Sequence, residues 1–375
     1  MLTTTRPNTA DYSSLFLNDT PLMDVRAPIE VIKGSFPHSK NIPLLDNQQR
    51  HEIGIRYKEQ GEQAAIHLGL ELATPEIRAQ RYKQWISFCE SNPHGFLYCF
   101  RGGLRSRTTQ QWLKEQGYDF PLVLGGYKAM RRFLIDELDE NIKRLSVLSI
   151  TGPTGSGKTR VLKEINHHVD FEGIAEHRGS AFGRNPQDTQ PSNIDWENNV
   201  SVGFLKHYHH FPKAPLFIED EGKLIGRVSM SKNIEILCKN NPLVLLEESM
   251  ERRILMTQED YIDSLWPEYI KTYHNDAEQY FTDYVLGSLS RIKKRLGGER
   301  YKEMKICFEL ALQHFLSTGD SNKFSDGIHI LLRDYYDPMY AYQRSKREGK
   351  IIFKGNRSEV IDWANDPQIH IKKQY

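Results

Sequence analysis

The sequence predicts an α/β protein of two domains, a parallel-sheet domain followed by a second α/β domain with a helical, basic C-terminal part. Short apolar runs alternate with polar, helix-like segments through most of the chain, which is typical of strands connected by helices. Two glycine-rich loops, residues 99–106 and 152–159, each follow an apolar run and precede a helical segment. We expect domains over residues 1–137 and 138–375, the second becoming helical from about residue 251.

The composition is typical of a soluble globular protein and excludes several other classes. The chain has 375 residues, of which 38% are hydrophobic and 26% charged, with a formal net charge of +1, so any nucleic-acid surface must be local. No run of about 18 apolar residues predicts a membrane span, and the polar stretch 1–14 does not resemble a secretion signal. The four cysteines form no CxxC pair, so we expect a cytoplasmic protein with reduced thiols and no zinc ribbon.

The expected elements of the first domain alternate along the chain. Apolar runs predict short strands at 22–26, 96–98 and 123–124, and a further apolar stretch covers 42–45. Helices are expected over 47–63, 75–90 and 106–116, the last of which ends at Gly117. Strands and helices in this order favour a sheet of parallel strands.

Cys99 lies at the carboxyl end of the strand 96–98, in the loop that opens the next helix. Open α/β sheets bind their ligands at that edge. Gly102 and Gly103 allow backbone N–H groups to turn inward around an anion, and the helix N-terminus adds positive potential. Both effects favour the thiolate form of Cys99, which predicts a nucleophile.

Two arginines of the same loop, Arg101 and Arg105, could hold a bound oxyanion, since a guanidinium can donate two parallel hydrogen bonds. The alternative for Cys99 is a buried structural cysteine, which is the commoner fate of an isolated thiol. We expect that fate for Cys89, which lies on a helix beside Phe88.

The second loop is a P-loop in the context that this motif requires. The apolar run 145–150 predicts a strand, and residues 160–166 continue as a helix. Backbone N–H groups of the loop would surround a phosphate, Lys158 would add a positive charge, and Thr159 could ligate Mg²⁺ if a metal is used. The candidate phosphate- or diphosphate-binding residues are Gly152, Gly155, Gly157, Lys158 and Thr159.

A carboxylate that follows a second strand would be needed to hold such a metal. Two segments qualify, the run 216–218 followed by Glu219 and Asp220, and the run 243–246 followed by Glu247 and Glu248. Spacing does not choose between them, and either could simply be a charged end of a core strand.

The segment 172–184 is rich in glycine, serine and arginine and is a candidate substrate loop. Arg178, Ser180 and Arg184 could hold a second phosphate or a nucleoside. His177 could act as a base or could only form a local hydrogen bond.

From Glu251 the sequence becomes helical and basic. Apolar residues recur at helical spacing over 285–296, and the opposite face of that helix carries four cations. Tyrosines and cations alternate over 333–347, a pattern that suits stacking on unpaired bases but also ordinary packing.

Several motifs of the first domain together resemble a rhodanese domain. They are Asp24-Val-Arg26, Asn41-Ile-Pro43-Leu44, the Cys99 loop and Leu124-Gly-Gly126-Tyr. In that family the loop cysteine carries a persulfide. The C-x5-R spacing from Cys99 to Arg105 is also that of Cdc25-type phosphatases, so a tetrahedral phosphorus compound would fit this loop.

A rhodanese-like domain joined to a P-loop domain that contains His177-Arg-Gly-Ser-Ala-Phe-Gly183 resembles the bacterial tRNA 2-selenouridine synthase family. The resemblance covers nearly the whole chain. It implies a transferase that replaces sulfur by selenium at C2 of a 5-substituted 2-thiouridine at the wobble position of tRNA. It also implies selenophosphate and geranyl diphosphate as substrates, with S-geranyl-2-thiouridine as the intermediate.

The resemblance implies roles for both loops. The P-loop binds the diphosphate of geranyl diphosphate rather than ATP as a fuel, because it recognises oxyanions through N–H groups. Cys99 takes selenium from selenophosphate as a perselenide or positions the donor, while Arg101 and Arg105 hold the phosphate portion. Partners are the anticodon region of 2-thiouridine-containing tRNAs and, as a candidate, the enzyme that supplies selenophosphate. No tightly bound cofactor and no dedicated metal site are expected.

Other functions are compatible with parts of the pattern. A phosphatase of the Cdc25 type, or a sulfurtransferase with a nucleotide-binding P-loop domain, would use the same two loops. A regulator that binds RNA, with a purely structural rhodanese module, would need neither Cys99 nor the two arginines.

Overall fold

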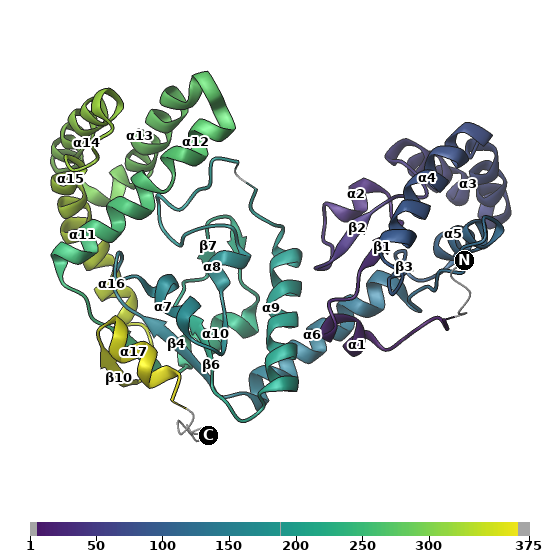
Figure 1. Cartoon of the computed structure of the whole chain (residues 1–375), viewed down its shortest axis with the longest axis horizontal. Coiled ribbons are helices and arrows are strands. Elements are labelled where there is room, and N and C mark those ends of the chain that lie inside the picture. The colour runs from purple at the N-terminus through teal and green to yellow at the C-terminus, as the bar shows by residue number, and fades with distance from the viewer. Residues whose placement is uncertain (1–5, 188, 367–375) are drawn as a thin grey trace. The chain divides into compact units, whose positions relative to one another are not determined.

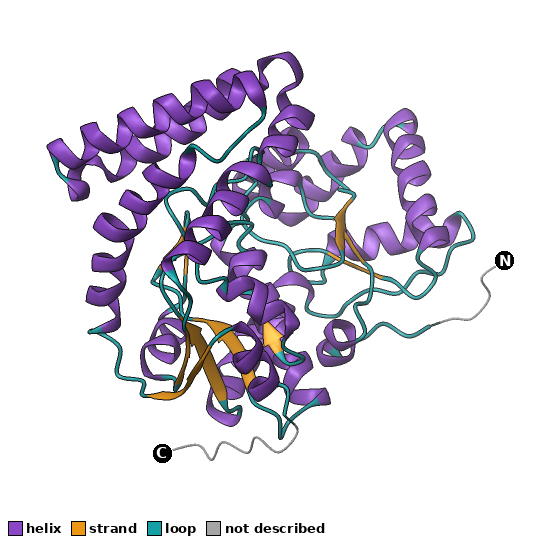
Figure 2. Cartoon of the chain, turned by 60° about the vertical axis from the view of Figure 1, so that its left-hand side comes forward, coloured by secondary structure: helices purple, strands orange, loops and turns teal. Residues whose placement is uncertain are grey.

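The structure is a computed structural model that describes residues 6–187 and 189–366. The chain forms two compact units. Unit 1 comprises Met1–Asn141 together with Ser192–Lys206, and unit 2 comprises Ile142–Pro191 together with His207–Tyr375. The expected division was 1–137 and 138–375, so the segment 192–206, expected in the second domain, belongs to the first unit. Short strands and many helices make up the chain (Figure 2).

Unit 1 is a small α/β unit whose sheet has three parallel strands in the order β2-β1-β3. Asp24 is in register with Asn41 on one side and with Tyr98 on the other. The elements, labelled in Figure 1, are α1 (Tyr12–Leu17), β1 (Leu22–Asp24), α2 (Pro28–Val31), β2 (Ser39–Asn41), α3 (Asn47–Leu72), α4 (Pro75–Ser91), β3 (Phe96–Tyr98), α5 (Leu104–Glu115), α6 (Gly126–Arg144) and α9 (Asn193–His210). The parallel sheet predicted for this part of the chain is confirmed.

Two apolar clusters form the core of unit 1. One contains Trp85 of α4 and Trp112 of α5, and the other contains Leu134 of α6 and Leu205 of α9. Although each strand has only three residues, β1 and β3 contribute residues to both clusters. Alternation of side chains along a strand places successive residues on opposite faces, which explains why helices pack on both sides of so small a sheet.

Three local features of unit 1 differ from the sequence prediction. The helix expected over 47–63 extends to Leu72 as α3 and is interrupted at Gly61, whose φ of 83° breaks the helical path. Residues 122 and 123 make only isolated parallel bridges, to Leu97 and Thr9, instead of a full strand. The stretch 42–45 lies beyond β2, which ends at Asn41.

Asp24 and Arg26 form a fully buried ion pair at the end of β1. Tyr98 donates a hydrogen bond to Asp24 Oδ2 at 2.9 Å, and Asn41 Nδ2 donates to the carbonyls of Asp24 and Arg26. The Arg26 guanidinium lies 3.9 Å from the centre of the Tyr127 ring. Buried charges are tolerated only when paired and hydrogen-bonded in this way, so these motif residues serve the framework rather than the chemistry.

Unit 2 contains a sheet of five parallel strands in the order β10-β9-β4-β6-β5. Its central strand β4 is buried along its whole length, and its core includes residues of α7 and α17 (Figure 1). The elements of this part are β4 (Val147–Thr151), α7 (Lys158–Glu164), β5 (His168–Val169), α8 (Phe171–Ile174), β6 (Leu216–Glu219), β7 (Leu224–Ile225), β8 (Val228–Ser229), α10 (Lys232–Asn240), β9 (Leu243–Leu246), β10 (Ile351–Gly355) and α17 (Arg357–Ala364).

The helical part of unit 2 packs around an aromatic core that includes Phe281, Phe308 and Phe324 (Figure 1). Its elements are α11 (Met250–Gln258), η1 (Glu259–Asp263), α12 (Trp266–Tyr273), η2 (His274–Asp276), α13 (Ala277–Leu296), α14 (Gly298–Thr318), α15 (Phe324–Leu331), η3 (Leu332–Tyr336) and α16 (Asp337–Arg344). The helix predicted over 285–296 is the second half of α13, which ends at Leu296 and is followed by Gly297.

The prediction of a helical chain from residue 251 onward is wrong at its end. Residues Ile351–Gly355 return to the sheet as β10, which pairs in parallel with β9, and α17 follows. The run Ile351-Ile352-Phe353 is rich in residues that favour strands and is flanked by Gly349 and Gly355, so the signal was present but short. No helix within the described ranges is long and apolar enough to cross a membrane, and all four cysteines are free thiols.

Candidate functional site

The P-loop joins the central strand β4 to the N-terminus of α7, as the motif predicts. It therefore lies at the carboxyl edge of the parallel sheet, where such sheets bind ligands. Two glycines of this loop have positive φ, Gly155 at 79° and Gly157 at 83°. A Cβ at Gly155 would lie 2.5 Å from Thr257 Oγ1 and 2.7 Å from the carbonyl oxygen of Arg253. The path of the loop therefore requires glycine for both conformation and space.

The last two side chains of the motif, Lys158 and Thr159, are held by neighbouring groups. Lys158 Nζ donates to the carbonyl oxygen of Gly152 at 3.0 Å, and Thr159 Oγ1 donates to Glu172 Oε2 at 2.9 Å. Both side chains border a cavity of about 440 Å³ that the loop partly encloses. The ammonium group is thus folded back over the mouth of the loop, where an incoming oxyanion would replace the carbonyl as its partner.

Two half-buried glutamates, Glu172 and Glu221, line this cavity, and the fully buried Glu219 ends strand β6 near them. Burial raises the pKa of Glu172, although Lys158 and the Thr159 hydroxyl oppose the shift. Burial, with the added repulsion of Glu172, raises the pKa of both Glu219 and Glu221 well above the usual carboxyl range. Glu219 Oε2 accepts a hydrogen bond from the backbone N–H of Phe171 at 2.7 Å. Carboxyl groups in this state keep their proton to a higher pH than an ordinary carboxyl group does.

The structure decides which carboxylates border the P-loop. Strands β6 and β9 flank β4 on opposite sides, so both candidates lie next to the central strand. Glu221, just beyond the end of β6, lines the cavity, and Asp220 accepts a hydrogen bond from Thr151 at 2.7 Å. Glu247 and Glu248 instead pair with Lys354 and Arg252. The segment after β6 is therefore the acidic element of this site.

The candidate substrate loop also reaches the cavity. Arg178 and Ser180 line it, and so does the buried His177. Phe182 anchors the loop in the helical core, stacked 5.3 Å from the Tyr261 ring. Arg184 is exposed and does not border the cavity, so the structure separates it from the other two predicted residues.

Arg253 of α11 was not predicted. Its Nε donates to the carbonyl oxygen of Thr154 at 2.9 Å, and its guanidinium pairs with Asp337 of α16. It thereby fastens the P-loop to the helical part of unit 2. A sequence signal for it was absent, because Arg253 is one of two adjacent arginines on an amphipathic helix and only the fold reveals which one is buried.

The Cys99 loop follows β3 and opens α5, in the predicted position. The N–H groups of Tyr127 and Lys128 donate to the carbonyl oxygens of Cys99 and Phe100, both at 2.9 Å. The first turn of α6 therefore holds the start of the loop. A Cβ at Gly126 would lie 2.3 Å from the Cys99 carbonyl oxygen, so glycine is required for this backbone contact.

Cys99 is 3% exposed and its Sγ lies 3.2 Å from Ser106 Oγ, within hydrogen-bond range for sulfur. Ser106 in turn donates to the carbonyl oxygen of Gly103 at 3.1 Å. The thiol is thus held at the base of the loop, close to the N-terminus of α5. Gly102 has a φ of 63°, as expected for a loop that turns its N–H groups inward.

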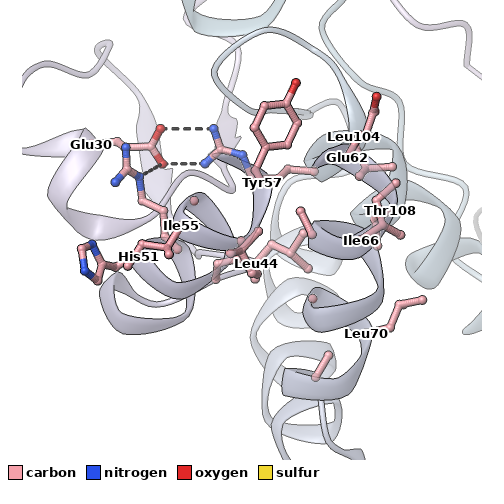
Figure 3. Close-up of a pocket in the computed structure, with 18 of the residues that line it drawn as sticks. Glu30, Leu44, His51, Ile55, Tyr57, Glu62, Ile66, Leu70, Leu104 and Thr108 are labelled. Carbon is pink, nitrogen blue, oxygen red and sulfur yellow. Dashed lines mark hydrogen bonds and ion pairs between the residues drawn. The ribbon is translucent and has the colours of Figure 1, made fainter. Parts of the chain in front are cut away.

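The two arginines of this loop have different surroundings. Arg101 is exposed. Arg105 donates two hydrogen bonds to Glu30, and Arg50 of α3 approaches the same carboxylate at 3.4 Å (Figure 3). Burial alone would raise the pKa of Glu30, but the hydrogen bonds and charge of Arg105, with Arg50, hold it below its usual value. Glu30 was missed from the sequence because it lies 75 residues from its partner.

The tyrosines and cations of the C-terminal part fall into two groups, one buried in the core and one exposed to solvent. Tyr335 and Tyr336 are buried in the helical core, and Tyr340 lies 3.3 Å from the Thr151 hydroxyl. Tyr342 is 65% exposed, with Lys346 Nζ 5.2 Å from its ring centre. The cations of α13 predicted to face solvent are exposed: Arg291, Lys293, Lys294 and Arg295.

Comparison with known proteins identifies relatives over nearly the full chain. A family model described as the tRNA 2-selenouridine synthase AAA domain matches residues 145–370. A tRNA 2-selenouridine synthase from Marinobacter nauticus is 46% identical, over 96% of this chain and 98% of that protein. One from Alcanivorax borkumensis is 47% identical, over 96% and 99% of the two chains, and one from Pseudomonas syringae is 42% identical, over 96% and 98%.

Proposed function

We propose, from the premise that this chain belongs to the tRNA 2-selenouridine synthase family, that it replaces sulfur by selenium at C2 of a wobble 2-thiouridine in tRNA. The observation that carries the proposal is the presence of two different glycine-rich loops, each between a parallel strand and a helix, in two separate units. One places a thiol beside a helix N-terminus, and the other is a P-loop above a cluster of protonatable carboxyl groups. Such a pair suits two successive transfers better than one hydrolysis.

In the first transfer, the P-loop binds the diphosphate of geranyl diphosphate. The thiocarbonyl sulfur attacks C1 of the geranyl group, the C1–O bond breaks, and diphosphate leaves into the loop, where Lys158 and backbone N–H groups stabilise its charge. The alkylated base loses its N3 proton, for which Glu172 in its ionised form is the acceptor at this cavity. This step needs no ATP, and Mg²⁺, if used, would bind the diphosphate beside Thr159.

In the second transfer, the Cys99 loop binds selenophosphate. Arg105, with Arg101 and the loop N–H groups, holds the phosphate oxygens, and Cys99 contacts the donor at its selenium. Selenium attacks C2, the C2–S bond breaks, and geranylthiolate leaves and takes up a proton. Water then cleaves the Se–P bond to give phosphate and 2-selenouridine. A perselenide on Cys99 would require an oxidant, because selenium in selenophosphate is already at the selenide level, so we favour direct attack.

The partner in both steps is a 2-thiouridine-containing tRNA, bound through its anticodon region. The exposed cations of α13, together with Tyr342 and Lys346, offer charge for the backbone and a ring for an unpaired base. A selenophosphate-supplying enzyme would feed the Cys99 loop.

The test is mass spectrometry of nucleosides from 2-thiouridine-containing tRNA treated with this protein, geranyl diphosphate and selenophosphate, each omitted in turn. We expect S-geranyl-2-thiouridine with geranyl diphosphate alone and 2-selenouridine when selenophosphate is added. No mass change with folded protein would contradict the proposal. ATP turnover that matched product formation one to one would contradict the assignment of the P-loop to diphosphate.

The C-x5-R spacing favours one alternative, a phosphatase of the Cdc25 type or a related sulfurtransferase. A phosphatase would use Arg105 in the same way as the proposed transferase, because in both reactions the guanidinium must leave Glu30 to face the bound phosphate. Release of phosphate from an aryl phosphate, lost on substitution of Cys99 and independent of tRNA, would favour this alternative.

A further inference from the structure

An apolar cavity of about 580 Å³ lies within unit 1, next to the end of the Cys99 loop (Figure 3). It shares Leu104 and Arg105 with that loop and the start of α5. Its walls come from α3, from the stretch that follows β2, and from α5. The lining is mostly aliphatic and aromatic, and includes Leu44, Leu45, Ile53, Ile66, Leu70 and Trp112. None of the residues proposed for catalysis explains why the unit should maintain this space.

The cavity exists because α3 is interrupted at Gly61 and because small residues line it. The positive φ of Gly61 divides α3 into two arms, and both arms contribute lining residues on either side of the break. Gly54 comes from the first arm, while Ala65 and Gly69 come from the second. A Cβ at Gly54 would meet no atom within 4 Å. Larger side chains at these positions would fill the space, so the sequence itself keeps it open.

The mouth of the cavity exposes an unusual amount of apolar surface. Ile55, Tyr57, Leu70 and Leu104 all line it and are 42%, 56%, 48% and 53% exposed. Isolated exposed apolar residues are ordinary, but a group around one concave site usually marks a binding surface. A volume of several hundred Å³ with an apolar lining is typical of a site for a small molecule.

The cavity has an ion-pair network at one edge, and His51, Lys58, Glu62 and Arg81 also line it among the apolar side chains. Glu30, Arg50 and Arg105 meet at this edge in the network drawn with dashed lines in Figure 3. A ligand seated here would therefore be apolar over most of its length and polar at the end nearest the Cys99 loop. This distribution disfavours a free sugar or a nucleotide, whose polar groups would be buried without partners.

We propose that this cavity binds the geranyl chain of the S-geranyl-2-thiouridine intermediate during the second transfer. The inference rests on the proposed function and adds the site at which the leaving group is held. The apolar chain lies in the cavity and its sulfur end points to the charged edge, which places C2 of the base beside the Cys99 loop. Water is excluded around the chain, so the enzyme recognises the alkylated base and not the unmodified 2-thiouridine.

The test measures the affinity of the full-length protein for two anticodon stem–loop RNAs that differ only in the alkyl group on sulfur, S-geranyl or S-methyl. We expect the wild type to bind the geranylated RNA at least about tenfold more tightly, because only the longer chain buries apolar area. The double variant Ile55→Glu/Leu70→Glu should bind both RNAs equally, since it places two carboxylates at the mouth. Both residues are partly exposed, so their replacement should not prevent folding.

Ile32→Glu is the matched control, because Ile32 is 75% exposed in the same unit but does not line the cavity. This variant should retain the preference for the geranylated RNA. An equal affinity of the wild type for both RNAs, or a preference that survives in the double variant, would overturn the inference. Failure of the wild type to convert geranylated RNA with selenophosphate into 2-selenouridine would instead reject the proposed function, so the two failures are distinguishable.

Discussion

Each of the two glycine-rich loops follows a parallel strand and precedes a helix, but the groups around the two loops differ. The P-loop borders a polar cavity with Lys158 on one side and carboxyl groups on the other. The Cys99 loop has a thiol at its base and ends beside an apolar cavity, with its arginine bonded to Glu30. A loop that receives a leaving diphosphate needs fixed donors. A loop that exchanges one chalcogen for another needs room for the group that leaves.

The difference suggests that Lys158 and Arg105 are available to a bound anion to different degrees. Lys158 Nζ donates to the Gly152 carbonyl oxygen, a neutral group that an oxyanion can readily displace, and the charge of Lys158 also acts on Glu172 and Glu221. Arg105 is held by a full carboxylate charge, so a bound anion must compete with Glu30 for the guanidinium. We therefore expect the P-loop to bind its anion without rearrangement and the Cys99 loop to bind its donor at the cost of that ion pair.

The largest expected effect is on the step assigned to the Cys99 loop and leaves the step assigned to the P-loop unchanged. Cys99→Ala should lower the rate of selenation by at least about 10³-fold, as removal of a group that contacts the reacting atoms usually does, and leave geranylation unchanged. Separate assays of the two steps by nucleoside mass spectrometry check this. Cys89→Ala is the control, because burial raises the pKa of that core thiol to about 12. Equal loss of both steps in Cys99→Ala would show that the loops do not divide the work.

The reciprocal effect is expected at the P-loop. Lys158→Ala should slow geranylation by about 10²–10³-fold, the usual cost of removing one preorganised donor, while selenation of pre-geranylated tRNA continues at the wild-type rate. Lys163 of α7 also borders the cavity but is 61% exposed and paired with Asp170, so Lys163→Ala should have a minor effect. A Lys158→Ala enzyme that failed only in selenation would reverse the assignment of the two loops.

The local geometry of both loops was predicted from the sequence. The strand–loop–helix context of the P-loop was predicted correctly, because all its determinants lie within about fifteen residues of chain. The same holds for the position of Cys99 after β3. Local motifs carry their own geometry, since glycine positions and a helix start fix the path of the backbone.

The surroundings of the loops were not readable, because they depend on contacts between distant segments. The Arg105–Glu30 pair and the link from Arg253 to the P-loop join residues far apart in sequence. The cavity beside the Cys99 loop depends on the break of α3 at Gly61, in a segment predicted as one plain helix up to residue 63. The choice between the carboxylates after β6 and those after β9 needed the lining of the P-loop cavity, because both strands flank β4 and no local pattern distinguishes them.

A moderate effect is expected from the geometry of Arg105. Arg105→Lys keeps the charge but loses the two-pronged donor, so we expect about a tenfold rise in the KM for selenophosphate with geranylation unaffected. Steady-state kinetics of the second step over a range of selenophosphate concentrations measure this. Arg107→Lys, at an exposed position on the same helix, is the control. An unchanged KM would show that Arg105 serves only to hold Glu30 in place.

The smallest expected effect concerns stability and contrasts the carboxylates at the ends of β6 and β9. Burial raises the pKa of Glu219 well above its usual value near 4.5, so the folded protein keeps a proton there that the unfolded chain has lost. The stabilisation is complete below the unfolded pKa and declines as pH rises toward the folded pKa, by up to about 1.4 kcal/mol per pH unit. Glu219→Gln removes this decline.

Denaturant unfolding of wild type and Glu219→Gln at a series of pH values above about 4.5 measures the difference. The free energy of unfolding of the variant should gain on that of the wild type as the pH rises, because glutamine stays neutral and can still accept the hydrogen bond from Phe171. Glu247→Gln, at an exposed site after β9, should follow the wild-type curve. Parallel curves for all three proteins would mean that Glu219 titrates as an ordinary carboxylate, and that solvent reaches its carboxyl group.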